Sequence, residues 1–185
     1  MPVLISMLRG VNVGPHKRIK MDALRGIYES LKLEDVRTFI QSGNIIFRTK
    51  EKNLPALAKK IQAAVEREFG FRPEVVLRTT DELRQAIAAS PFTKRRDVEP
   101  AKLLITFLIA EPAPEAHSTL SNLKSHPEEL HLKGRELYIY FPNGMGKTKL
   151  PWSSVEKLLK TTGTARNLNS AVKMLAIAEE IEAAG

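Results

Sequence analysis

The sequence predicts an α+β protein made of two tandem halves, each with the element order βαββαβ. Three observations predict it. Short β-rich runs alternate with longer segments whose apolar residues fall at helical spacing. The stretch Arg37–Phe47 has the pattern of two strands joined by a tight Ser-Gly-Asn turn. After a segment with two prolines and a basic cluster, residues 90–101, the pattern of strands and helices begins again. A chain of 185 residues is long enough for one domain or two small ones.

The first half opens with an apolar run, Val3–Leu8, which predicts a strand. Apolar residues between Met21 and Leu31 recur every three or four positions and predict a helix. The hairpin over residues 37–47 supplies the next two strands. We expect Gly43 and Asn44 to adopt the positive φ that its turn needs.

A long amphipathic helix is predicted at Leu54–Phe69, and Gly70 is positioned to end it. Pro73–Arg78 is the fourth expected strand. Thr79 and Glu82 then have the spacing of a capping box, which predicts that a connecting helix begins there.

The second half repeats this order. The predicted elements are a strand at Leu103–Ile109, a helix at Pro112–Leu123, strands at Glu129–Leu132 and Leu137–Phe141, a helix at Trp152–Leu159, a strand at Thr162–Arg166 and a helix at Ser170–Ala183. Asn169 is the expected N-cap of the last helix. The order βαββαβ is that of the ferredoxin-like unit. The prediction is therefore two tandem ferredoxin-like halves with accessory helices: residues 1–89, a linker at 90–101, and residues 102–185. The halves share no obvious sequence repeat.

The composition excludes several classes of chemistry. The chain has no cysteine, which rules out disulfides, a thiol nucleophile and a thiolate metal site. Its first residues lack a basic leader, and no apolar run reaches membrane-spanning length, so we expect a cytoplasmic protein without a membrane partner. The net charge of +8 favours anionic partners, although a solvated basic surface would have the same composition.

The predicted topology brings polar loops together. In a βαββαβ unit the end of the first strand and the turn between the second and third lie at one rim of the sheet. Residues 9–14 should therefore adjoin residues 41–44, and residues 142–149 should adjoin 166–169. These loops combine glycines with cations and amides, which suit phosphate or carboxylate groups. We predict a small anionic ligand in a polar cleft between the two halves, bound by Arg9, Asn12, Gln41, Asn44, Asn143, Lys147, Lys149, Arg166 and Asn169. Turn and cap roles would explain many of the same residues.

The sequence resembles the bacterial domain-of-unknown-function family 1697. The resemblance spans nearly the whole chain and is carried by Leu8–Gly14, Val36–Asn44, Pro91–Phe92, Tyr138–Gly144 with Lys149, and Thr164–Asn169. It implies a duplicated ferredoxin-like fold and brings no established activity. One departure is Leu168, where the family leads us to expect Trp.

The sequence lacks the more specific motifs of phosphate binding, dinucleotide binding and catalysis. Gly146-Lys147-Thr148 lacks the first glycine of a phosphate-binding P-loop, because Phe141 stands there. The first loop lacks the glycine spacing of dinucleotide folds. The four histidines are best interpreted as surface residues, and Ser42 has no neighbouring base in sequence. We therefore predict no cofactor and no metal, and we assign no reaction.

Two alternatives to a small-ligand site stay open. The same cations suit a sequence-tolerant nucleic-acid-binding module, but the segment Lys133–Tyr140 lacks the aromatic residues of an RNA-recognition strand. The other alternative is an interaction scaffold whose loops are purely structural. Replacement of both Lys147 and Lys149 by Ala should leave folding nearly intact if these residues serve a ligand.

Overall fold

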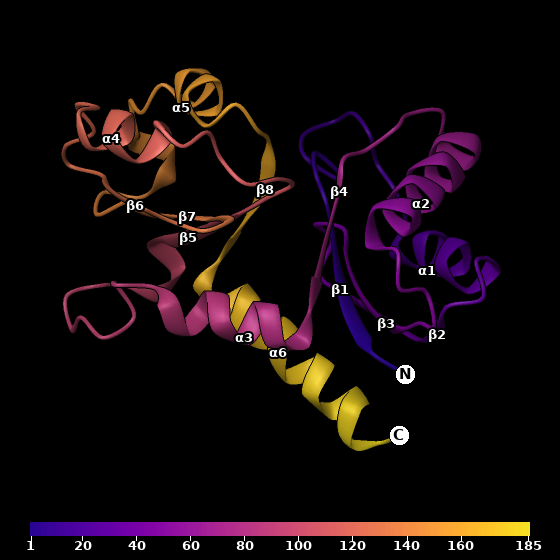
Figure 1. The fold of residues 1–185 in the computed structure, drawn as a ribbon. Coiled ribbons are helices and arrows are strands. Elements are labelled where there is room, and N and C mark those ends of the chain that lie inside the picture. The colour runs from indigo at the N-terminus through magenta and orange to yellow at the C-terminus, as the bar shows by residue number, and fades with distance from the viewer. The chain divides into compact units, whose positions relative to one another are not determined.

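The computed structural model describes residues 1–185 and shows an α+β protein with two four-stranded antiparallel sheets and six α-helices (Figure 1). The chain divides into two compact units. The first contains Met1–Arg84 together with Lys173–Gly185, and the second contains Gln85–Val172. The division falls inside α3 (Thr80–Ala89) and α6 (Leu168–Ala183), so the units do not coincide with the predicted halves 1–89 and 102–185. Those halves stay a prediction of the domain boundaries.

The first unit has the predicted element order. It contains β1 (Val3–Leu8), α1 (Met21–Ser30), β2 (Glu34–Phe39), β3 (Asn44–Arg48), α2 (Leu54–Phe69) and β4 (Val75–Thr79). The strands form one sheet in the order β2-β3-β1-β4, and every neighbouring pair is antiparallel. The hairpin predicted over residues 37–47 is confirmed as β2 and β3.

The second sheet repeats this arrangement. After α3 (Thr80–Ala89) come a 3-10 turn at Pro100–Lys102, β5 (Leu103–Leu108), α4 (Ala116–Ser121), β6 (Glu129–Lys133), β7 (Glu136–Tyr140), a 3-10 turn at Met145–Lys147, α5 (Trp152–Leu159), β8 (Gly163–Asn167) and α6 (Leu168–Ala183). The strand order is β6-β7-β5-β8. None of the helices combines the length and apolar character that crossing a bilayer requires.

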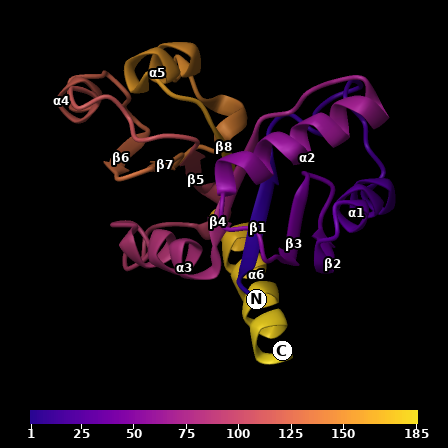
Figure 2. The same ribbon diagram turned by 45° about the vertical axis from the view of Figure 1, so that its right-hand side comes forward.

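Helices α1 and α2 cover one face of the first sheet, as Figure 2 shows, and the core of this unit lies between them and the strands. Buried Leu24 and Ile61 of the two helices pack in one cluster with Leu4 of β1. The hydroxyls of Tyr28 and Ser6 hydrogen-bond to each other inside it at 2.7 Å. This bond satisfies the polar end of a fully buried ring, and burial raises the pKa of Tyr28.

Local signals set the helix ends. The predicted capping box is confirmed, because the Thr79 N–H donates to Glu82 (2.9 Å) and the Glu82 N–H donates to Thr79 Oγ1 (3.1 Å). The predicted N-cap of α6 was wrong by two residues: Asn167 accepts from the Ser170 N–H at 2.8 Å, and Asn169 lies within the helix with an exposed side chain.

The segment predicted as a linker packs against the second sheet. The Arg95 guanidinium pairs with the carboxylates of Asp97 and of Glu129 on β6. The ring of Phe92 lies 6.3 Å from that of Tyr140, whose hydroxyl donates to the Asp97 carbonyl. Together these contacts join the segment to β6 and to the last residue of β7.

Candidate functional site

The end of β1 and the turn between β2 and β3 lie together in the first unit, as the topology predicts. The Leu8 N–H donates to the Gly43 carbonyl at 2.9 Å. The side chain of Asn12 donates from Nδ2 to the Gln41 carbonyl at 2.6 Å. The predicted adjacency of residues 9–14 and 41–44 is therefore confirmed.

Glycine is required at position 43 of this turn. Gly43 has φ of +74°, and a Cβ there would lie 3.1 Å from the Cβ of Leu8. The second residue with positive φ is Ile40, at +49°, so the prediction for Asn44 was wrong. Asn44 is extended and fully buried at the start of β3, where its Nδ2 donates to the Phe39 carbonyl and to Ser42 Oγ. Its amide thus holds the turn together.

Asn12 fixes the loop that leads into α1. Its backbone has φ of +57°, a conformation that asparagine tolerates better than most residues. Its Nδ2 also donates to the Ile19 carbonyl at 3.0 Å, and its Oδ1 accepts from the Ile19 N–H at 2.7 Å. One side chain therefore closes the loop from residue 12 to residue 19 and ties it to the β2–β3 turn.

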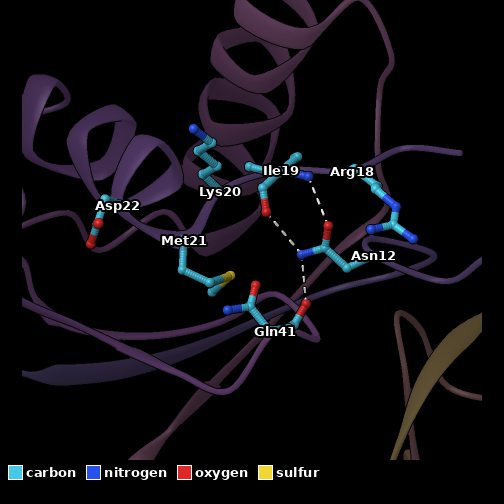
Figure 3. A pocket seen from close by; sticks show the side chains of 7 residues that line it. All are labelled: Asn12, Arg18, Ile19, Lys20, Met21, Asp22 and Gln41. Atoms are coloured by element: carbon cyan, nitrogen blue, oxygen red, sulfur yellow. Dashed lines mark hydrogen bonds between the residues drawn. The ribbon is translucent and has the colours of Figure 1, made fainter. Parts of the chain in front are cut away.

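An open pocket of about 650 Å³ lies where these segments meet (Figure 3). Its lining comes from the loop before α1, from the first turn of α1 and from the β2–β3 turn: Asn12, Arg18, Ile19, Lys20, Met21, Asp22 and Gln41. Ile19 is buried, whereas the side chains of Arg18, Lys20, Asp22 and Gln41 are exposed. The pocket lies wholly within the first unit.

The charged groups of this pocket lack protein partners. Several other arginines of the first unit are ion-paired, for example Arg9 with Glu74, Arg25 with Glu29 and Arg37 with Glu180. Arg18 and Lys20, by contrast, form no ion pair or side-chain hydrogen bond, and the carboxylate of Asp22 is also unpaired. The pocket thus presents two available cations and one available anion to solvent.

The start of α1 adds partial positive charge. Lys20 is the N-cap and gives no side-chain cap, so the first N–H groups of the helix keep hydrogen-bonding capacity. The helix dipole favours negative charge at this end. Asp22 lies in the first turn of α1, so its carboxylate supplies part of that negative charge.

Of the four ligand-binding residues predicted in the first half, Asn12 and Gln41 line the pocket. Among these four, only the side chain of Gln41 forms no hydrogen bond with the rest of the protein. The side-chain amides of Asn12 and Asn44 donate hydrogen bonds to other groups of the protein. Arg9 is half-buried and pairs with Glu74 at 3.1 Å. Ligand contacts of Arg9, Asn12 and Asn44 stay a prediction. The contacts that the structure shows for these side chains are with other residues of the protein.

The five residues predicted in the second half lie in the second unit. Leu103 pairs with Tyr140, and Leu104 pairs with Asn167, so the segments after β7 and β8 share a rim as predicted. Exposed side chains on these segments include Asn143, Lys147, Lys149 and Asn169.

Arg166 is buried on β8. Its Nη1 donates to Thr164 Oγ1 and to the Ala165 carbonyl, both at 2.8 Å. Desolvation lowers the pKa of Arg166 to about 10. Arg166 thus contacts its own strand, and the predicted ligand site spanning both halves stays a prediction.

The sequence prediction missed Arg18, Ile19, Lys20, Met21 and Asp22 as lining residues. A usable signal was present, because Arg18 and Lys20 belong to a basic cluster just before a predicted helix start. No group of three or more His, Asp or Glu side chains is placed to hold a metal ion.

Comparison with known proteins adds a family and a fold. The family described as "Protein of unknown function (DUF1697)" matches residues 1–138. The solved structure of the conserved bacterial protein SP0830 from Streptococcus pneumoniae is similar to this chain, with a TM-score of 0.69 and 21% sequence identity over 96% of this chain and 98% of that one. At this identity the likeness shows the fold alone. No curated protein is significantly similar in sequence.

Proposed function

Since the chain belongs to the DUF1697 family, for which no function is described, we propose its function from the pocket: the protein binds a small anionic ligand, phosphorylated or carboxylated, at Arg18 and Lys20. One observation carries this proposal. Two cations without protein partners line a single hollow, in a unit where several other arginines are paired with carboxylates.

The donors suit an oxyanion. A guanidinium presents a planar fork that matches phosphate and carboxylate geometry, and an ammonium adds a flexible point charge. Backbone N–H groups at the uncapped start of α1 support negative charge beside them. A volume of about 650 Å³ lies within the usual range of small-molecule sites.

A nucleic-acid partner has less support. Tyr138 and Tyr140 share a face of the second sheet that could stack bases only if it were open. Both rings are buried, and the Tyr138 hydroxyl donates to the Ala86 carbonyl at 2.5 Å. No aromatic side chain lines the pocket of the first unit.

We also infer that each half is ferredoxin-like. The support is the element order βαββαβ and the matching strand orders β2-β3-β1-β4 and β6-β7-β5-β8.

The test is isothermal titration calorimetry with inorganic phosphate, comparing wild type with the Arg18→Ala/Lys20→Ala variant. We expect the double substitution to weaken binding at least tenfold, because hydrogen bonds to charged groups each contribute about 1.5–3 kcal/mol. Folding should be nearly unchanged, since exposed charges contribute little to stability.

Two matched controls remove the same charge at the same spacing. Lys94→Ala/Arg96→Ala alters exposed cations outside the pocket and should bind phosphate like wild type. Lys147→Ala/Lys149→Ala alters the cations that the sequence assigned to the ligand. If this variant loses phosphate while Arg18→Ala/Lys20→Ala keeps it, the proposed pocket is wrong and the loop at 142–149 holds the ligand.

A further inference from the structure

Building on the proposed function, we infer that the ligand of this pocket is a phosphate monoester that carries hydrogen-bond donors, hydroxyl or ammonium groups, at the end remote from its phosphate. The pocket is not simply basic. It combines unpaired cations with an unpaired carboxylate, and Arg18 lies apart from Asp22 (Figure 3).

Figure 3 shows this separation. Arg18 and Asp22 lie at opposite ends of the lining, with Lys20, Met21 and Gln41 between them. Neither charged group pairs with the other or with a third residue. Inorganic phosphate would engage Arg18 or Lys20 and be repelled by Asp22. A ligand with phosphate at one end and donors at the other satisfies both ends.

The middle of the pocket fits the body of such a molecule. The amide of Gln41 can both donate and accept hydrogen bonds, which suits hydroxyl groups. The side chain of Met21 supplies a small apolar surface for the carbon atoms of the ligand. Because the lining includes no Phe, Tyr, Trp or His, a nucleobase would find no ring to stack on. The chemistry therefore favours a sugar phosphate or an aminoalkyl phosphate over a nucleotide.

Asp22 also has a structural role that the test must separate. A carboxylate in the first turn stabilises a helix through the dipole, so Asp22→Asn is expected to lower stability slightly. Asp81→Asn, which removes a first-turn carboxylate of α3 outside the pocket, is the control for binding, although it also breaks the ion pair of Asp81 with Arg84.

The experiment is calorimetric titration of the full chain with inorganic phosphate, ribose 5-phosphate, phosphoethanolamine and AMP. We expect at least one of the two small esters to bind about tenfold more tightly than inorganic phosphate. Asp22→Asn should abolish that advantage and should bind inorganic phosphate at least as tightly as wild type, because the repulsion by Asp22 is removed. Asp81→Asn should retain the advantage. Ribose 5-phosphate reports hydroxyl donors, and phosphoethanolamine reports an ammonium donor. AMP should bind no more tightly than ribose 5-phosphate.

The failures are distinguishable. If inorganic phosphate binds as tightly as both esters, or if Asp22→Asn preserves the preference, the inference is overturned and the anion site stands. An AMP affinity well above both esters would also overturn it, because it would require a base-binding surface. If no compound binds and Arg18→Ala/Lys20→Ala changes nothing, the proposed function itself fails.

Discussion

Replacing Gly163 by Ala is expected to lower the free energy of unfolding by about 3 kcal/mol or more, because the added methyl group has no space. Gly163 begins β8 and pairs with Leu108 of β5. A Cβ at this position would lie 2.3 Å from the Phe107 carbonyl oxygen and 2.9 Å from its carbon. These are backbone atoms of the central strand, so no side-chain rotation can relieve the clash. Urea unfolding followed by circular dichroism would measure the loss.

A second glycine provides a control of opposite sign. Gly26 lies in the interior of α1, and a Cβ there meets nothing within 4 Å. Gly26→Ala should raise stability by about 0.5–1 kcal/mol through helix propensity. A Gly163→Ala protein with a wild-type unfolding midpoint would show that β8 does not approach β5 as closely as the structure has it.

The elements that the sequence predicted best are those with local signals. β1, α2 and α5 have the predicted bounds because an apolar run, helical spacing and flanking Gly or Pro residues define them. α4 is shorter than predicted. The segment at 112–115, which holds Pro112 and Pro114, stays outside the helix, which begins at Ala116. Proline lacks the N–H that helix interiors require.

The sequences of the two halves do not reveal the internal repeat, because what repeats is the pairing of equivalent strands. Arg78 faces Ile5 across the β1–β4 pair, and Arg166 faces Ile105 across the β5–β8 pair. Both arginines are buried, and both donate from Nη1 to the carbonyl of the preceding residue. Around them the residue types differ, so a pairwise comparison of the halves finds little.

The sequence placed the ligand in a cleft between the two halves, whereas the pocket lies within the first unit and shares only Asn12 and Gln41 with the predicted residues. Topology correctly brought Asn12 and Gln41 together. Sequence cannot show which charges find partners, however, and that property separates Arg18 from the ion-paired Arg9. It also cannot show that the amides of Asn12 and Asn44 are already occupied by backbone groups.

Replacing Asn12 is expected to disrupt both the loop and the pocket. Asn12→Gly keeps a residue that tolerates positive φ but removes three hydrogen bonds, so we expect a loss of about 2 kcal/mol in unfolding free energy. Asn12→Ala removes the same bonds and adds the strain of a left-handed backbone, which costs about 1 kcal/mol more. Asn143→Ala, at an exposed side chain, should change stability by less than about 0.5 kcal/mol.

The order of the two Asn12 variants distinguishes the causes. If the hydrogen bonds matter most, both proteins lose stability, and both lose phosphate affinity because the segment carrying Arg18 is no longer tied to the β2–β3 turn. If backbone strain matters most, Asn12→Gly stays close to wild type and only Asn12→Ala is damaged. Wild-type stability and phosphate binding in both variants would mean that the Asn12 side chain does not hold the loop, and the pocket would then need another support. Stability is read from urea unfolding, and binding from calorimetry at a temperature where each variant remains folded.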